Sequence, residues 1–145
     1  MRKVLLIAFI LSAHIGLSQS VPKLVEFAEA HFAAHQYLEA IEYYEKIVSI
    51  DKQNIESRYK LAICYQQTLQ YDKAEVAFIA LGNRPDHPFR ARSLYYYATL
   101  RMHDSAYEEA DSVYNVLISM PDASPELIDL SRNHKEGCLL AIRQK

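Results

Sequence analysis

The sequence predicts an all-α protein: an α-solenoid of three stacked helix pairs, closed by one C-terminal helix and preceded by a signal peptide. Three observations lead to this prediction. A block of residues recurs at intervals of 34 and 36 residues, as Tyr37, Tyr71 and Tyr107 show. Within each block, small and apolar residues stand at i, i+4 and i+7, the spacing of one face of an α-helix. The prolines fall between these stripes, where they do not interrupt a helix.

The first element, residues 1–18, is predicted to be a signal peptide. Arg2 and Lys3 precede an uninterrupted apolar run over 4–11, which is too short to cross a bilayer because a spanning helix needs about 20 apolar residues. A basic start, a short apolar core and small residues before the cut are typical of a secretory signal. Gly16 and Ser18 stand at the −3 and −1 positions for cleavage after Ser18. The alternative is a buried N-terminal helix.

The three helix pairs follow, predicted over residues 21–54, 55–88 and 89–122. Two columns of the repeat hold only alanine, a side chain small enough to let the helices of a pair approach closely: Ala28, Ala62 and Ala98 in the first helices, Ala40, Ala74 and Ala110 in the second. A third column is aromatic, and a fourth holds large residues that we expect in the core: Tyr44, Phe78 and Tyr114, then Phe27, Leu61 and Tyr97.

The last element, residues 123–145, is predicted to be a capping helix that covers the open end of the stack. Ser124 is the expected N-cap, and Pro125 suits the first turn. At the end of the second repeat, Gly82-Asn83 is expected to form a left-handed helix cap.

Composition excludes several functions. The formal net charge of −2 provides no basic face for nucleic acid. With three glycines, the chain has neither a Gly-rich phosphate loop nor a nucleophile elbow. We therefore expect no enzyme, no catalytic residue and no cofactor. Apart from the apolar run of the signal peptide, nothing suggests a membrane helix, so we expect no transmembrane span in the mature chain.

Two pairs of residues deserve separate interpretation. His31 and His35 could place two imidazoles on one helix face for zinc, but no third ligand accompanies them, so we expect structural roles and no metal. Cys64 and Cys138 belong to helices with another helix between them. Because neighbouring axes lie 8–10 Å apart, the two thiols should be about 18 Å apart, beyond disulfide reach. We expect both to be buried and unpaired.

The repeat columns resemble the tetratricopeptide repeat, a helix–turn–helix family of period 34 with small residues at its eighth and twentieth positions. The resemblance covers roughly residues 21–122. It departs at the eleventh position, where the family's Tyr is kept only at Tyr65 and is replaced by His31 and Arg101. The chain also resembles the N-terminal repeat region of larger Gram-negative envelope proteins, which continue into domains such as an OmpA-like peptidoglycan-binding module.

The resemblance implies a concave groove, lined by the first helices, that binds a protein or peptide. The positions that would line it are Val25, Glu29, Phe32, Tyr59, Ile63, Gln66, Arg92, Tyr95, Thr99 and Met102. Tyr59 and Tyr95 share one repeat position, so we expect their rings side by side, outside the core, as binding anchors. The family's basic clamp for chaperone C-termini is not reproduced, since Val25 and Glu29 stand where Lys and Asn are expected.

The functional expectation is an exported protein-interaction scaffold in a bacterial envelope assembly. The alternative is a structural spacer or oligomerisation module, the N-terminal part of a larger peptidoglycan- or outer-membrane-associated protein. The expected partner is a protein or peptide, not a nucleic acid, with peripheral association to an outer-membrane complex as one arrangement. Periplasmic, outer-membrane-associated and extracellular locations all fit the signal peptide.

Overall fold

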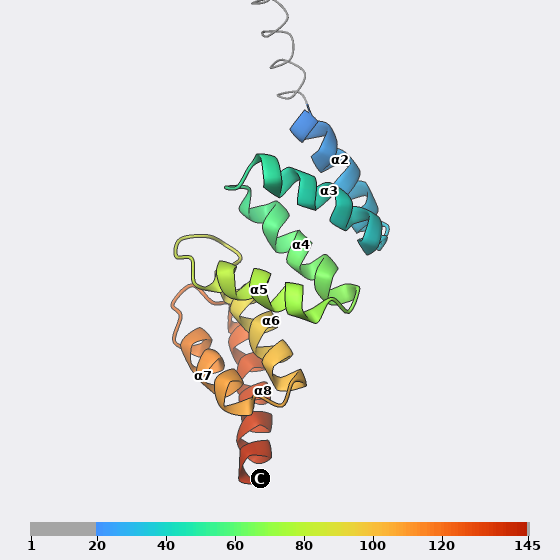
Figure 1. Ribbon diagram of the computed structural model, residues 1–145. Coiled ribbons are helices and arrows are strands. Elements are labelled where there is room, and N and C mark those ends of the chain that lie inside the picture. The colour runs from blue at the N-terminus through green and yellow to red at the C-terminus, as the bar shows by residue number, and fades with distance from the viewer. Residues whose placement is uncertain (1–19, 145) are drawn as a thin grey trace, which may run out of the picture.

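The computed structural model describes residues 20–144, a segment that contains seven α-helices and no strand. The predicted signal peptide lies outside the described residues. The helices are α2 (Ser20–Ala33), α3 (Tyr37–Ile50), α4 (Ile55–Gln67), α5 (Tyr71–Gly82), α6 (Arg90–His103), α7 (Tyr107–Ile118) and α8 (Pro125–Arg143), as Figure 1 shows. This all-helical architecture is consistent with the predicted solenoid.

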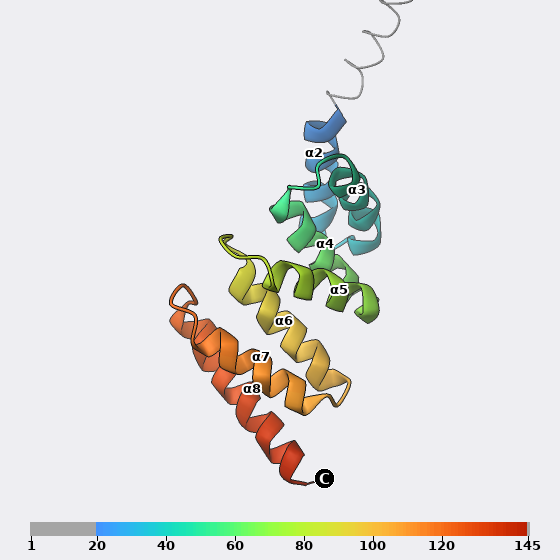
Figure 2. The ribbon, with the colours of Figure 1, turned by 60° about the vertical axis from the view of Figure 1, so that its left-hand side comes forward.

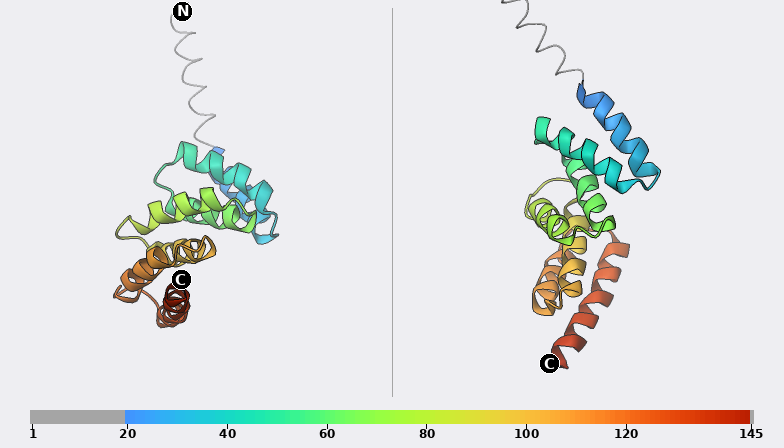
Figure 3. Two further views of the ribbon diagram at one scale, coloured as in Figure 1. Left: turned by 60° about the horizontal axis from the view of Figure 1, so that its bottom comes forward. Right: turned by 45° about the vertical axis from the view of Figure 1, so that its right-hand side comes forward.

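The helices stack in chain order, and each packs on the next; α8 also touches α6. The stack is elongated, with α2 and α8 at opposite ends (Figure 2). Turned views show the successive antiparallel helix pairs and the final helix lying along α7 (Figure 3). Because contacts are mainly between neighbours, no pair could bury its apolar face without the next one.

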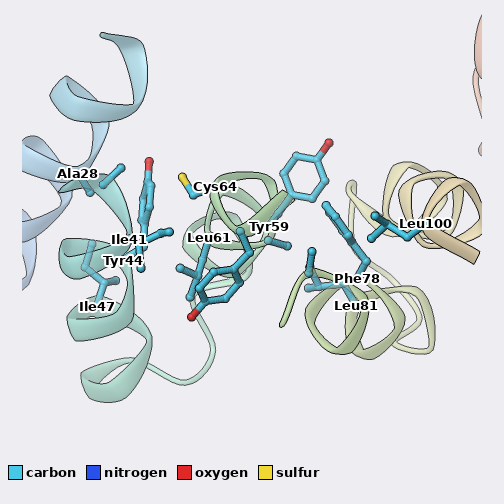
Figure 4. Close-up of a cluster of buried hydrophobic side chains, with 14 residues drawn as sticks. Ala28, Ile41, Tyr44, Ile47, Tyr59, Leu61, Cys64, Phe78, Leu81 and Leu100 are labelled. Carbon is cyan, nitrogen blue, oxygen red and sulfur yellow. The ribbon is translucent and has the colours of Figure 1, made fainter. Parts of the chain in front are cut away.

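The alanine columns are the tightest points of the stack. All six alanines predicted from the repeat are completely buried, and so are the aromatic residues of the third column, Tyr44, Phe78 and Tyr114. One large cluster of buried side chains runs through α2 to α6, and Figure 4 shows part of it between α3, α4 and α5. The prediction that these columns form the core is confirmed.

One core prediction is wrong. Phe27, placed in the core column with Leu61 and Tyr97, is 50% exposed. Leu61 is buried because its helix, α4, lies between α3 and α5. In contrast, α2 stands at the end of the described stack and packs mainly on α3, so no helix among the described residues covers the other side of Phe27. Its ring stacks on Tyr43, with the ring centroids 5.6 Å apart.

The turn inside each of the three repeats uses left-handed backbone, as does Asp86 (φ 62°) in the connection between α5 and α6. His35, Leu69 and Ser105 have φ values of 58°, 60° and 61°. In the second repeat, Gln70 donates its backbone N–H to the carbonyl of Tyr65 and Leu69 donates to Gln66, the pair of hydrogen bonds of a Schellman motif. The first and third repeats end their first helices in the same way. Each turn therefore holds a side chain in a conformation that favours glycine.

The left-handed cap expected at Gly82-Asn83 is wrong. Gly82 is the last residue of α5, Asn83 has φ −79°, and neither has positive φ. A methyl group on Gly82 would lie 2.5 Å from Cδ2 of Leu94 in α6. Glycine is required here by the close approach of two helices rather than by backbone conformation.

The C-terminal helix begins as predicted. The Ser124 side chain accepts a hydrogen bond from the backbone N–H of Leu127, and Pro125 occupies the first turn. Cys138 and Ser131 on the inner face of α8 are completely buried. No helix within residues 20–144 is long and apolar enough to cross a membrane.

Candidate interaction surfaces

The predicted groove residues lie on the first helix of each repeat: α2, α4 and α6. Val25, Phe32 and Ile63 are half-buried and pack against the core, which leaves part of each apolar side chain at the surface. Glu29, Gln66 and Thr99 are half-buried polar residues, and Arg92 is exposed. The remaining three positions, each expected at the open surface, are occupied by contacts within the protein.

Tyr59 is a core residue, so its prediction as an exposed anchor is wrong. It is 8% exposed, and its ring stacks on Phe89 at a centroid distance of 4.6 Å. Phe78 of α5 lies edge-on at 6.3 Å (Figure 4). Burial is the main cause that raises the pKa of the Tyr59 phenol to about 12. Phe89, which precedes α6, covers Tyr59, whose repeat position was predicted to lie at the surface.

Tyr95 and Met102 lie under the capping helix. Tyr95 stacks on His134 of α8 with centroids 5.5 Å apart, and its other ring neighbours are Tyr96 and Tyr114. The expected pairing of the Tyr59 and Tyr95 rings is therefore wrong. Met102 accepts a hydrogen bond from the Tyr114 hydroxyl, 3.5 Å from its Sδ. The capping helix thus covers part of the surface that α6 was predicted to contribute.

Glu29 links the first two repeats. Its carboxylate accepts hydrogen bonds from the hydroxyl of Tyr44, at 2.7 Å, and from Nζ of Lys60 in α4, at 2.6 Å. Burial, followed by the bond to Glu29, raises the pKa of Tyr44 well above its usual value. Lys60 also pairs with Glu56 at 2.9 Å. Glu29 is already engaged by two internal donors, which limits its use for a ligand.

Tyr65 and Arg101, at the eleventh repeat position, also link neighbouring repeats. This shared role explains why an arginine can stand where the resemblance leads us to expect a tyrosine. The Tyr65 hydroxyl donates to Glu45 of the preceding repeat at 2.6 Å. Arg101, at the same position, reaches back to Glu75 at 2.8 Å. Both residues connect a first helix to the second helix before it. Arginine therefore replaces the tyrosine as an inter-repeat connector.

Two hollows on the described surface are considered as binding sites, and the larger of these two contains none of the predicted groove residues. It has a volume of about 810 Å3 and lies between α3, α4 and α5. Its lining consists of Val48, Lys52, Gln53, Arg58, Leu61, Tyr65, Asp72, Lys73, Val76, Ala77, Ala80, Leu81 and Arg84. One sequence signal could have revealed it: Val76 is apolar but lies off the buried stripe of its helix, and it is 69% exposed.

The smaller hollow does include predicted residues. It measures about 330 Å3, lies between the ends of α4 and α6, and is lined by Gln66, Gln67, Leu69, Tyr71, Thr99, Leu100 and His103. The side-chain oxygen Oε1 of Gln66 is shielded from solvent and accepts no hydrogen bond within residues 20–144. The structure therefore brings Gln66 and Thr99 together, as the groove prediction requires, and leaves an unused acceptor beside them.

The residues considered for metal or redox chemistry have local partners. Nδ1 of His31 lies 2.7 Å from Oε1 of Gln36, and Nδ1 of His35 lies 2.8 Å from the Tyr37 hydroxyl. Within the described residues, no group of three His, Cys, Asp or Glu side chains is placed to hold a metal ion. Cys64 and Cys138 are both buried and unpaired, as predicted. Burial raises the pKa of Cys64 to about 12, which opposes thiolate formation.

Comparison with known families finds a match over part of the chain. Residues 31–98 match the family model of the tetratricopeptide repeat. Together with the seven stacked helices, this match is consistent with a tetratricopeptide-repeat α-solenoid. Repeats of this class generally mediate protein–protein interaction. No curated protein was found to match the chain.

Proposed function

We propose that the protein is an exported interaction scaffold that binds a partner peptide on the surface formed by α2, α4 and α6, in a bacterial envelope assembly. The tetratricopeptide match supports the general class of function. The partner surface is narrower than the ten predicted positions suggest, because Tyr59 is buried and the capping helix covers Tyr95 and Met102. The binding surface we propose is formed by Val25, Phe32, Ile63, Gln66, Arg92 and Thr99.

The observation that favours this surface is the unused acceptor of Gln66. A buried polar atom without a hydrogen bond costs about 1–3 kcal/mol, so a ligand N–H that reached it, after rotation of the amide, would recover that free energy on binding. The hollow around Gln66 is lined by polar and apolar groups in similar measure, including Thr99 and Leu100. An extended peptide provides both backbone N–H donors and side chains for such a surface.

Export is the second part of the proposal, and it rests on residues 1–18. The basic start, the short apolar run and the small residues before position 19 support cleavage after Ser18. Amino-terminal sequencing of the protein from cell fractions tests this step. A mature chain that begins at Gln19 is expected, whereas an intact Met1 in the membrane fraction would contradict cleavage.

The alternative, a spacer or oligomerisation module, is favoured by the internal contacts of the groove. Glu29 is held by Tyr44 and Lys60, and α8 covers part of α6. A spacer needs only a stable stack and no open binding surface. The two functions differ in their dependence on Gln66, which contributes no hydrogen bond through Oε1 to the fold.

Affinity capture of the full chain from an envelope extract, followed by mass spectrometry, distinguishes the two functions. Gln66→Ala should weaken the affinity for a partner recovered with the wild type by roughly tenfold, which is about 1.4 kcal/mol of binding free energy. Asn115→Ala removes an exposed amide on α7 and is the matched control. Equal recovery with both variants would exclude this surface, and recovery of no partner with the wild type would favour the spacer.

A further inference from the structure

The groove between α3, α4 and α5 has an apolar floor that lies open to solvent. Leu61 of α4 lies between α3 and α5 (Figure 4), and Val48 and Ala77 extend this surface along the two flanking helices. Val76 is 69% exposed. From Asp72 to Leu81 the groove follows α5 for about 14 Å, at 1.5 Å per residue, and Arg84 extends it beyond the end of the helix. With this extension, the groove fits a helical peptide of about twelve residues.

One end of this groove concentrates positive charge. Lys52, Arg58 and Arg84 line it together. Nε of Arg58 donates to the carbonyl of Lys52 at 2.8 Å, and Nη2 of Arg84 donates to Oε1 of Gln53 at 2.5 Å. Both acceptors are neutral oxygens, so these bonds hold the two guanidinium groups at the rim without compensating their positive charges. Among the described residues, none of the three cations forms an ion pair.

Two cations with more deeply buried side chains, Lys60 and Arg101, are paired with carboxylates. Lys60 pairs with Glu29 and Glu56, and Arg101 pairs with Glu75, Glu109 and Asp104. At the opposite end of the groove, Lys73 lies over the Tyr65 ring, and Asp72 stands beside it. The single acid of the lining is thus remote in sequence from the cationic end. The three cations give this end a local excess of positive charge, in contrast with the formal net charge of −2 for the chain.

We propose that this groove is a second docking site, which binds an acidic amphipathic helix of a partner protein. Apolar side chains of the helix pack on Val76, Ala77 and Ala80, and its carboxylates pair with Lys52, Arg58 and Arg84. Burial of an apolar stripe supplies affinity, and the charge pairs fix the direction of the helix in the groove. The site shares α4 with the surface proposed above but none of the residues of that surface, so it is independent of the function proposed there.

The first experiment selects binders to the purified full chain from a phage-displayed library of random peptides of about twelve residues, the helical length of the groove. Enriched peptides are then synthesised with a fluorophore and titrated by anisotropy. We expect an excess of Asp and Glu together with apolar residues at helical spacing, and affinities that fall as salt is raised. Enriched peptides without an acidic excess, or no enrichment, would overturn the proposal.

Matched variants locate the binding site. Val76→Asp and Arg84→Glu should each weaken the selected peptides by about tenfold or more, since each places a carboxylate beside the acidic ligand. Val116→Asp on α7 and Lys46→Glu on α3 change equivalent exposed residues outside the groove and should leave affinity unchanged. Circular dichroism verifies that all four variants are folded. Equal loss in the control variants would overturn the proposal.

Other occupants give different results. A second copy of the chain would appear as concentration-dependent association in sedimentation, reduced by Val76→Asp. An anionic lipid surface would appear as binding to phosphatidylglycerol vesicles, reduced by Arg84→Glu. Either result, in the absence of acidic peptide binders, contradicts the peptide proposal. Loss of peptide binding through Gln66→Ala, with Val76→Asp unaffected, would assign the peptides to the α2–α4–α6 surface instead.

Discussion

Gly82→Ala tests the close packing between the second and third repeats. The added methyl group would lie 2.5 Å from Cδ2 and 2.9 Å from Cγ of Leu94. Leu94 is 5% exposed and packs in a cluster with Ala91, Leu117 and Met120, so it has little room to move. Overpacking of this kind costs about 1–3 kcal/mol, against a gain in helix propensity of at most about 1 kcal/mol. We expect the free energy of unfolding to fall by about 1–2 kcal/mol.

Gly137→Ala is the matched control for this substitution. Its methyl group would meet only Cε of Met102, at an ordinary 3.7 Å, so the variant should gain about 0.5–1 kcal/mol from helix propensity. Urea unfolding followed by circular dichroism measures both variants. Because Leu94→Ala removes the obstructing side chain, it should cost about 1–3 kcal/mol less in the Gly82→Ala background than in the wild type. Equal stabilisation by both glycine substitutions would refute the close approach of α5 and α6.

Four further outcomes are expected. Leu69→Gly should raise the free energy of unfolding by about 1 kcal/mol in urea titrations, because Leu69 is exposed and has φ 60°; a loss of stability would contradict the turn geometry. Tyr59→Ala should lower the free energy of unfolding by about 3–5 kcal/mol, the cost of truncating an aromatic residue in the core; an unchanged stability would contradict the burial of Tyr59. The thiol of Cys64, whose pKa burial raises to about 12, should react with a thiol reagent only on unfolding, so rapid labelling of the native chain would be inconsistent with its burial. Hydrogen bonds from Tyr97 and then Arg101 hold the pKa of Glu109 below its usual 4.5, so the contribution of Glu109 to stability is present above pH 4.5 and is lost as the pH falls through the lowered pKa. The free energies of unfolding of Glu109→Gln and the wild type should therefore differ at neutral pH and converge in acid. A difference that stays constant with pH would argue against this linkage.

The columns of the repeat were sufficient to predict the core because helix-pair packing repeats with the sequence. The alanines and the aromatic third column face another helix in every repeat, and all of them are buried. Phe27 occupies a core column, yet it is exposed, because no helix of the described part of the chain packs on α2 from the side opposite α3. A pattern of residues records which face of a helix is apolar, but not whether a neighbour is present to cover it.

The candidate site was less predictable because it depends on contacts between residues distant in the chain. Tyr59 was assigned to the open surface by its repeat position, but Phe89, thirty residues later in the chain, covers it. The cationic end of the larger groove combines Lys52, Arg58 and Arg84 from two loops and a helix. No regular spacing links these residues. They come together because α3, α4 and α5 pack against one another in the stack.

Site-specific photo-cross-linking in the cells that make the protein tests the interaction function most directly. A photoactivatable side chain is placed at Gln67, an exposed residue that lines the smaller hollow, and at Leu38, which is 64% exposed on α3 and lines neither hollow. A scaffold that binds a partner on the first helices should give one discrete cross-linked product from Gln67 and none from Leu38. No product from Gln67, or the same products from both positions, would contradict the account.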